Sequence, residues 1–353
     1  SADMLKYVYF PGTNTGYKYE YSPAWGMINK VSNLRGMQIS SSGLTETGTV
    51  TGEGQAAATT EYNYPLTLGT PLTDVPKYTT RTDDWLGRTT PTAPVTTYNV
   101  TADTANNRTI SKITSPDGTI TETWTRNAEG SWDDGLVTDT FVKTVISLQL
   151  QTYKTWAHTK LFWGNQTNAS GRQNSRILKI EQTNDADQTR ATTFEYDSYN
   201  NQTFIKEHDF AAPNTLGTEL RKTEISYVNG AGWINNRLVS LPNLIKTTVN
   251  NAVVSKSVIE YDNNGAAASS NLIARTDIDT QTHDSRYNWG NGSYDSATDY
   301  RGNPTKMTAF SDATLVTDPN AVVSTTKYDI AGNAVEAGAI CCKLKEWEYV
   351  KAS

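Results

Sequence analysis

The sequence predicts an all-β protein of stacked antiparallel hairpins that form a wound, solenoid-like sheet with little or no helix. The chain of 353 residues contains 54 threonines, 19 tyrosines and 9 tryptophans, residue types that fit the pleated surface of a strand. Tyr-Asp pairs recur at the ends of strand-like runs, followed by Asn or Gly, which suit tight turns. No long window has the periodicity of an amphipathic helix.

The tyrosines of the recurring unit are regularly spaced. Tyr196, Tyr227, Tyr261, Tyr294 and Tyr328 are separated by 31, 34, 33 and 34 residues. Such repetition indicates an elongated or wound architecture in which hairpins stack on their neighbours. In each unit we expect the Asp after the tyrosine to close the turn, the ring to stack on its equivalent in the next hairpin, and the hydroxyl to reach water or a neighbouring residue. The repeat-defining residues are Tyr196, Asp197, Tyr261, Asp262, Gly265, Tyr328, Asp329, Gly332 and Asn333.

Two further hairpins are marked by their turns. Ile110–Thr114 and Thr119–Trp124 flank Ser-Pro-Asp-Gly, a strong turn signal. Leu244–Val249 and Ala252–Ile259 flank Asn250-Asn251, which suits a turn whose two central residues have positive φ. The alternation of polar and apolar residues around both turns predicts strands with one wet face.

We expect one elongated β region over residues 1–353, with a loop-richer part to residue 100, clearer hairpins over 100–340 and a tail over 341–353. The first hundred residues hold seven of the twelve prolines. The small-residue run from Ile39 to Thr60 predicts a long loop or an exposed edge hairpin, and residues 66–96 also read as loop. The beginning Ser1-Ala2-Asp3-Met4 lacks the form of a signal peptide and reads as the start of an excised segment.

Charge and hydropathy exclude two classes of partner. A net charge of −6 with no basic cluster argues against nucleic acid. No apolar run is long enough to cross a membrane. The two cysteines, Cys341 and Cys342, are adjacent, so a disulfide between them would be strained. We read them as ordinary thiols, with intermolecular pairing as the alternative.

The sequence offers no anchor for catalysis, a cofactor or a metal. His158, His208 and His283 lie far apart and outside any hydrolase or zinc motif. Asp83-Asp84 and Asp133-Asp134 could supply a glycosidase-like carboxylate pair, but turn roles explain them better. Asn184–Asp187 and Asp262–Gly265 offer oxygen ligands for calcium without the distal Glu of a calcium loop. We therefore predict a protein that is not an enzyme.

The Tyr-Asp units resemble the YD-repeat, or RHS-repeat, family of bacterial RHS type. Tyr328-Asp329-Ile330-Ala331-Gly332-Asn333 is similar to the family consensus of Tyr-Asp, two variable residues, Gly, then Asn or Arg and a hydrophobic strand. Asp299–Asn303 and Asp84–Arg88 match it from the Asp onward. The resemblance implies hairpins wound in a spiral, which in some members closes into a shell around a toxin and in others belongs to a cell-surface adhesion protein.

These features predict a non-catalytic, extracellular or cell-surface structural protein that assembles with copies of itself through exposed strand edges into a filament or surface layer. The alternatives are a segment of a toxin-enclosing RHS shell, joined to the remainder of a longer chain, and a carbohydrate-binding adhesion module. Exposed Trp and Tyr could stack on sugars, although most aromatics in β-proteins pack in the core. Candidate glycosylation sites are Asn99, Asn107, Asn165, Asn168, Asn201 and Asn291.

Overall fold

The computed structural model describes residues 4–23, 26–40, 49–65, 77–89, 92–147, 152–167, 173–262, 300–328, 332–339 and 342–347. Twenty strands belong to one antiparallel sheet of sequential hairpins, and β4 and β5 form a separate two-stranded sheet. The helical elements in the described ranges are a single turn of 3₁₀ helix, η1, and the five-residue helix α1. These features confirm the all-β class, the antiparallel hairpins and the near absence of helix; the winding of the sheet stays a prediction.

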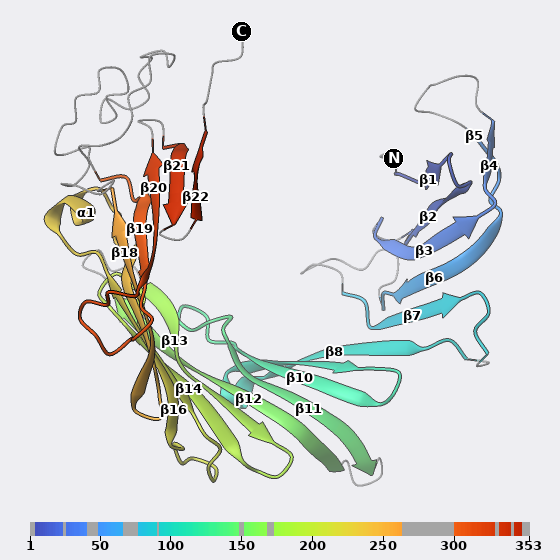
Figure 1. Ribbon diagram of the computed structural model, residues 1–353. Coiled ribbons are helices and arrows are strands. Elements are labelled where there is room, and N and C mark those ends of the chain that lie inside the picture. Colours follow the sequence, from blue (N-terminus) through green and yellow to red (C-terminus); the bar gives the residue numbers. More distant parts are fainter. Residues whose placement is uncertain are drawn as a thin grey trace. The chain divides into compact units, whose positions relative to one another are not determined.

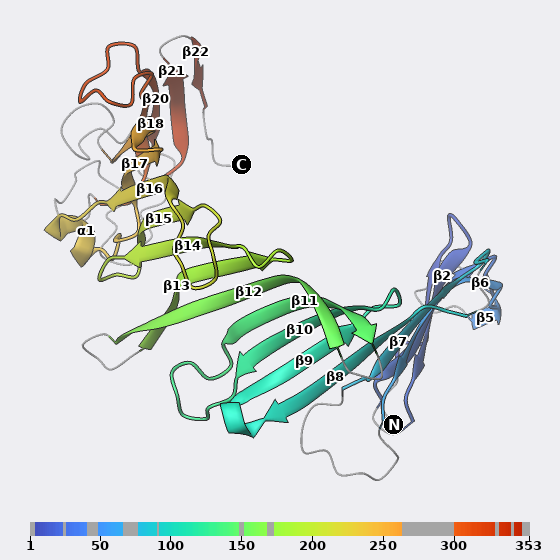
Figure 2. The same cartoon turned by 90° about the horizontal axis from the view of Figure 1, so that it is seen from below.

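The chain forms two compact units, one of residues 1–160 and 184–186, the other of residues 161–183 and 187–353. The description of residues 1–353 as a single region stays a prediction. In the first unit, β2, β3 and β6 lie side by side (Figure 1), and β8 to β11 do so as well (Figure 2). The elements that begin in this unit are β1 Tyr7–Phe10, β2 Thr15–Tyr21, β3 Ile28–Arg35, β4 Gln38–Ser40, β5 Thr49–Gly52, β6 Gln55–Asn63, β7 Thr80–Trp85, β8 Val95–Asp103, η1 Thr104–Asn106, β9 Arg108–Thr114, β10 Thr119–Arg126, β11 Val137–Ser147 and β12 Thr152–Thr167.

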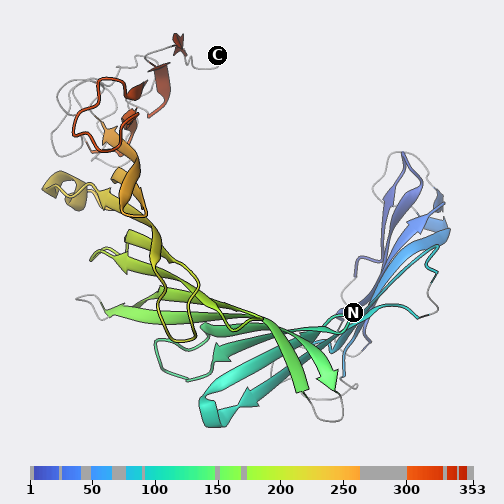
Figure 3. The same cartoon turned by 60° about the horizontal axis from the view of Figure 1, so that its bottom comes forward.

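In the second unit each strand from β14 to β19 pairs with the next along the chain, and β19 to β22 continue the series. Figure 3 gives another view of these strands, coloured from yellow-green to red in chain order. The elements are β13 Gln173–Asn184, β14 Thr189–Tyr196, β15 Gln202–His208, β16 Glu219–Tyr227, α1 Ala231–Asn235, β17 Pro242–Val249, β18 Ala252–Tyr261, β19 Pro304–Ala309, β20 Val322–Tyr328, β21 Ala334–Ala339 and β22 Cys342–Glu346.

The first hundred residues contain more strand than the sequence predicted. Of the two alternatives predicted for Ile39–Thr60, a long loop or an exposed edge hairpin, the β4–β5 pairing matches the hairpin. The last part of the run belongs instead to β6, which pairs with both β3 and β7. Within residues 66–96, β7 and the start of β8 are strands as well, while 66–76 and 90–91 lie outside the described residues. Alanine has a low strand propensity, yet pairing on both sides places Ala56–Ala58 in a strand.

In the second unit, the strand registers give the sheet two chemically different faces. One face carries Glu224 opposite Lys246 and Glu260 opposite Lys306, in ion pairs of 2.8 and 2.7 Å. Because side chains alternate along a strand, the neighbouring row Ile225–Ile245–Ser257–Ala309–Val322 belongs to the other face. The sequence alternation therefore separates an ionic face from an aliphatic and hydroxyl-bearing one.

Few side chains are buried. Among the described residues the buried hydrophobic side chains are Leu34, Met37, Ile120 and Ala191, whereas Met307 and Val322 on the aliphatic face remain 45% and 58% exposed. A globular domain of this length normally buries a continuous core. The sheet of each unit is therefore held mainly by strand pairing, cross-strand side-chain contacts and turn closure.

Both turns singled out in the sequence form. Thr114 pairs with Ile120 across the Ser-Pro-Asp-Gly turn, in which Gly118 has φ +83° and donates its N–H to the Ser115 carbonyl at 2.9 Å. Val249 pairs with Ala252 across Asn250-Asn251, whose φ angles are +46° and +65°. Both hairpin predictions are confirmed.

Among the described residues, no helix combines the length and apolar character that a membrane crossing requires.

The Asn250-Asn251 turn provides a test of the β17–β18 hairpin. Asn251→Ala should lower the free energy of unfolding by about 1 kcal/mol, because alanine is strained at positive φ. The matched variant Asn251→Gly should retain wild-type stability within about 0.5 kcal/mol. Urea unfolding followed by tryptophan fluorescence measures both, and equal loss in the two variants would contradict a turn with positive φ at this position.

Candidate functional site

A ladder of tyrosine hydroxyls lies at one end of the strands in the second unit. Four strands end in a tyrosine, and each hydroxyl donates a hydrogen bond to a backbone carbonyl of the preceding strand. The bonds run from Tyr196 to Ile177, from Tyr227 to Gln202, from Tyr261 to Pro242 and from Tyr328 to Pro304, at 2.7, 2.9, 2.9 and 3.2 Å. The acceptor is the first residue of its strand in the last three cases.

The same tyrosines also fix the next strand. At each one the register shifts, and the tyrosine pairs with the first residue of the strand that follows: Tyr196 with Gln202, Tyr227 with Pro242, Tyr261 with Pro304 and Tyr328 with Ala334. Gln202, Pro242 and Pro304 therefore pair with one tyrosine and accept a hydrogen bond from the next. Proline is tolerated at the first residue of a strand, where it removes no ladder hydrogen bond.

The first unit contains the same arrangement at lower copy number. Tyr21, the last residue of β2, donates to the Leu5 carbonyl at 2.5 Å and pairs with Ile28 after a register shift. The Ile28 carbonyl in turn accepts the hydroxyl of Tyr64 at 3.3 Å. The ladder is therefore a repeated device of both units rather than a local feature of one.

Burial accounts for the electrostatics of the ladder. The pKa values of the Tyr227, Tyr261 and Tyr328 hydroxyls are raised above the ordinary value chiefly by burial, which disfavours the phenolate. At neutral pH each of these three hydroxyls is therefore protonated and donates its hydrogen bond to the carbonyl. Hydrogen bonding, rather than the ring stacking expected from the sequence, joins one repeat to the next; the ring contacts of Tyr261 include Trp233, at 6.1 Å between centroids.

The aspartate after the tyrosine closes the turn. Asp197 accepts the N–H groups of Tyr199 and Asn201 at 2.8 and 2.9 Å, and the Asn201 side-chain amide at 2.9 Å. This is the role that the sequence predicted for the residue. Asn201 is itself buried and also donates its amide to the Val239 carbonyl at 2.7 Å, so the turn is tied to the connection between β16 and β17.

The Asp262 turn is split. Asp262 is almost fully buried and accepts the backbone N–H groups of Arg301, Gly302 and Asn303 at 2.8, 2.8 and 2.9 Å. Burial raises the pKa of Asp262, and these three donors act in the opposite direction. Gly302 has φ +82°, the left-handed conformation that favours glycine.

The sequence treated Tyr261-Asp262 and Asp299–Asn303 as two copies of the repeat, and this was wrong. Asp262 and the described residues 301–303 form one turn, in which Gly302 and Asn303 take the places assigned to residues just after Asp262, while Asp299 lies outside the described residues. Gly265 and Tyr294 lie outside the described residues. In the last copy, Tyr328, Gly332 with φ +83° and Asn333 are described, and Asp329 is not.

A cluster of stacked side chains crosses β9 to β12 in the first unit. The Arg108 guanidinium lies 3.6 Å from the centroid of the Trp124 ring. Phe141 contacts Trp124 at 4.7 Å between centroids and stacks on His158 at 4.1 Å and 7°. His158 Nε2 lies 2.8 Å from Oδ1 of the buried Asp139. Burial raises the pKa of Asp139, but the hydrogen bonds from His158 and Thr138, together with nearby positive charge, lower it by more, so that the pKa lies below its ordinary value.

His208 and the aspartate pairs Asp83-Asp84 and Asp133-Asp134 each have local hydrogen-bond or ion-pair partners. His208 lies 3.1 Å from the Gly217 carbonyl, and His283 is outside the described residues. Asp83 accepts from Thr60 and Arg81, and Asp84 from Arg88. Asp133 pairs with Arg126 at 3.1 Å, whereas Asp134 accepts the Ala128 N–H at 2.8 Å. These carboxylates serve as acceptors for turns and neighbouring strands.

The oxygen-rich loops also have local partners. Asn184 accepts the Ala186 N–H at 3.0 Å, and Asp187 has φ +56° in the same turn. Within the described ranges no group of three or more His, Cys, Asp or Glu side chains could hold a metal ion. Cys342 lies in β22, and Cys341 is outside the described residues.

The candidate glycosylation sites differ in accessibility. Asn99 and Asn107 are exposed, whereas Asn165 has a buried side-chain oxygen without a hydrogen-bond partner in the described part of the chain. A glycan on Asn201 would remove one of the two N–H groups with which its side-chain amide binds Asp197 and the Val239 carbonyl. Asn168 and Asn291 lie outside the described residues.

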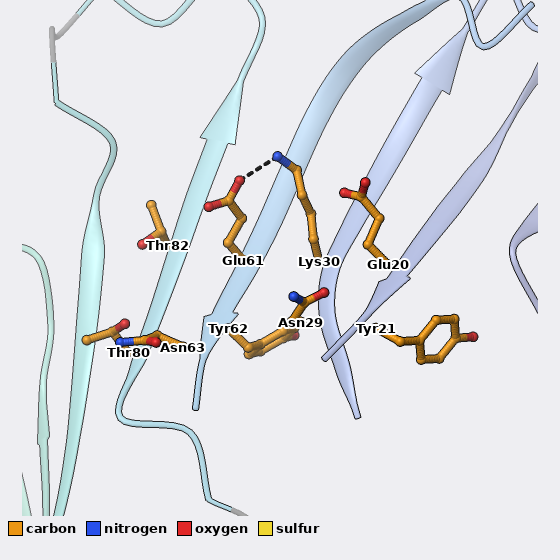
Figure 4. Close-up of a pocket in the computed structure, with 9 residues that line it drawn as sticks. All are labelled: Glu20, Tyr21, Asn29, Lys30, Glu61, Tyr62, Asn63, Thr80 and Thr82. Atoms are coloured by element: carbon orange, nitrogen blue, oxygen red, sulfur yellow. Dashed lines mark hydrogen bonds and ion pairs between the residues drawn. The ribbon is translucent and has the colours of Figure 1, made fainter. Parts of the chain in front are cut away.

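A polar groove of about 630 Å³ crosses β2, β3, β6 and β7 in the first unit (Figure 4). Glu20, Lys30, Glu61 and Thr82 face one another across the four strands, and the Lys30 Nζ atom lies 2.5 Å from Glu61. Because Lys30 lies between Glu20 and Glu61 and pairs with Glu61, the row is an ionic ladder with one carboxylate in excess rather than a strongly charged site. The remaining lining residues are Tyr21, Asn29, Tyr62, Asn63 and Thr80.

No family model and no curated protein matches the chain. Among solved structures, the chain is similar to a chain of the Tc holotoxin pore of Photorhabdus luminescens, with 12% identity over 95% of this chain and a TM-score of 0.28. It is also similar to a chain of the TcdB2-TccC3-Cdc42 complex, with 10% identity over 95% of this chain and a TM-score of 0.22, and of the TcdB2-TccC3 complex, with 11% identity over 92% and a TM-score of 0.22. The chain spans 14%, 20% and 19% of the length of those three chains.

The ladder can be tested at one rung. Tyr261→Phe should lower the free energy of unfolding at pH 7 by about 1 kcal/mol, because the Pro242 carbonyl loses its donor. Since burial raises the Tyr261 pKa in the folded chain, the stabilisation is complete below the unfolded tyrosine pKa and is lost as pH rises through the folded value. The variant should therefore lose less stability than the wild type between neutral and strongly alkaline pH.

Tyr199→Phe is the matched control, because the Tyr199 ring is 48% exposed. Urea unfolding at a series of pH values measures both variants. Equal effects of the two substitutions would rule out a special role for the strand-end hydroxyl.

The Asp139–His158 contact predicts a loss of stability in acid. The folded pKa of Asp139 is lowered, so its contribution is present above the unfolded aspartate value and is lost as pH falls through the folded value. Asp139→Asn should lower the free energy of unfolding at pH 7 by about 2 kcal/mol and flatten its decline below about pH 4. Asp185→Asn, on an exposed side chain, should change neither quantity; a decline in Asp139→Asn as steep as in the wild type would contradict the assignment.

Proposed function

We propose that the chain is a non-catalytic structural segment of a larger RHS-type β-sheet wall, with the tyrosine ladder as its connecting device. The observation that carries this proposal is that Gln202, Pro242 and Pro304 each serve two successive repeats. Such a device has no natural end, because each added hairpin supplies the acceptor for the next tyrosine. This suits a long wall better than a small self-contained domain.

The scarcity of buried hydrophobic side chains supports the same role. Since the described residues bury few apolar groups, the sheet of each unit has two accessible faces instead of one wet and one packed face. A wall that separates two spaces has this property. In the second unit the ionic face, with Glu260–Lys306 and Glu224–Lys246, suits an aqueous side.

The proposal extends to partners and place. The Tyr-Asp motifs resemble those of RHS proteins, in some of which such walls enclose a toxin, and the solved structures similar to this chain include Tc toxin components. We propose that the partner of the sheet is further RHS-type sheet of a longer polypeptide, and that the assembly acts outside the cell or at its surface.

A second function, self-assembly into a filament, is favoured by a separate observation. Among the described strands, β1 pairs with β2 and β22 with β21, so each of these two strands has one unpaired edge. Unpaired edges can template another chain. Copies joined in this way would lengthen as concentration rises.

Sedimentation of the purified chain over a hundred-fold concentration range separates the two functions. A wall segment should remain at the monomer mass of 38.8 kDa, whereas a filament former should grow in mass and appear as fibres by electron microscopy. Antibodies against the chain should detect a polypeptide much larger than 38.8 kDa in the native source if the wall proposal holds. A native product of 38.8 kDa that forms fibres would overturn the proposal in favour of the filament.

A further inference from the structure

The turn after β7 carries two large apolar side chains on the surface of the first unit. Trp85 and Leu86 are 51% and 55% exposed. The residue opposite Trp85 on β6 is Ala58, so the indole has no large cross-strand partner. Within the described part of the chain, no aromatic ring or cation is paired with this indole, in contrast to Trp124 and Trp156. Tryptophan in a β-protein usually packs in the core or against another side chain, so this exposure calls for an explanation.

The turn is a ridge beside two hollows, of about 720 and 350 Å³. Trp85, Gly87 and Arg88 line both of them. The larger hollow is completed by Thr89, Thr92, Ala93, Pro94, Val95 and Pro116, and the smaller one by Ala56, Ala58, Thr59, Asp84 and Leu86.

The ridge is rigid. Gly87 has φ +87°, and the Arg88 N–H donates to the Trp85 carbonyl at 3.3 Å. The Arg88 side chain, 12% exposed, donates to Asp84 at 2.8 Å and to the Thr92 carbonyl at 2.5 Å, which ties the turn to the segment that precedes β8. These bonds fix the backbone from which the indole extends, which limits the conformational entropy that the turn loses when a ligand binds.

The chemistry of the two hollows indicates the ligand class. The indole and the prolines offer flat apolar surface, while Thr59, Thr89 and Thr92 offer hydroxyl groups that can donate and accept hydrogen bonds. Among the described lining residues the one cation, Arg88, already binds Asp84 and the Thr92 carbonyl, so these residues offer no spare positive charge to an anionic ligand. A sugar ring combines an apolar C–H face with a hydroxyl edge and carries no charge.

We propose that the Trp85 ridge is a binding site for a neutral saccharide, with the indole stacked on one sugar ring and the threonine hydroxyls on its edge. This site is independent of the wall function, because Trp85 takes no part in the tyrosine ladder. It would give the first unit of a structural segment the ability to attach to a glycan.

Binding of the full chain to an array of neutral oligosaccharides, followed by calorimetric titration of the strongest one, tests the proposal. Trp85→Ala should weaken binding at least ten-fold, and Trp85→Tyr, which keeps a flat ring, should restore most of it. Trp156→Ala is the matched control, since the Trp156 ring is also exposed but is covered by Lys154 at 3.6 Å and donates to Thr144 at 2.9 Å; it should leave the affinity within two-fold.

Three results would overturn the proposal: no binding of any neutral oligosaccharide at millimolar concentration, binding that Trp85→Ala leaves unchanged, or binding of a proline-rich peptide with no saccharide bound. Circular dichroism and the thermal midpoint of each variant establish that it is folded. If Trp85→Ala is unfolded, the comparison of Trp85→Tyr with Trp85→Leu replaces it, because leucine keeps apolar volume without a flat ring.

Discussion

In the second unit, the hydroxyl of a tyrosine at the end of a strand donates a hydrogen bond to a backbone carbonyl of the preceding strand. This hydrogen bond sets the register of the strands. Its acceptor residue is also the pairing partner of the previous tyrosine in three successive cases, so a displaced rung would affect the strands on both sides. In a sheet with few buried apolar side chains, hydrophobic burial alone specifies register weakly. The ladder supplies the specificity that a packed core would otherwise provide.

Other interactions stabilise the turns and the faces of the sheet. Aspartates 197 and 262 close the turns beyond the tyrosines by accepting backbone N–H groups. Cross-strand ion pairs such as Glu260–Lys306 cover one face of the sheet and contribute modestly, because they are partly exposed. In the first unit the Arg108–Trp124–Phe141–His158 stack joins neighbouring strands in a similar way. Stability is therefore distributed along the sheet, as in repeat proteins generally.

The sequence was informative at turns whose residues follow one another in the chain, and misled at the Asp262 turn, whose two halves are far apart in sequence. Asn250-Asn251 and Ser115–Gly118 have side chains or backbone freedom that demand particular dihedral angles, and their hairpins were predicted with the correct pairing. Ala56–Ala58 were missed because small residues have no strand preference of their own, and pairing on both sides decides their state. The tyrosine acceptors could not be predicted, since a backbone carbonyl has no sequence signature. In the sequence, the residues of the Trp85 ridge were recognised only as the turn motif Asp84–Arg88. The exposure of the Trp85 indole could not be predicted, because it depends on the small residue Ala58 opposite Trp85 on β6.

The split turn at Asp262 has a consequence for how such chains can change. Asp262 accepts hydrogen bonds from the backbone N–H groups of Arg301, Gly302 and Asn303, and β18 pairs directly with β19. Residues 262 and 301–303 therefore connect the two strands in the way that a four-residue turn would. The length of chain between these two points is thereby uncoupled from the register of the strands. Such a turn is a permissive position for grafting: a foreign sequence, an affinity tag or a whole small domain could be placed between the two halves while the neighbouring repeats keep their pairing.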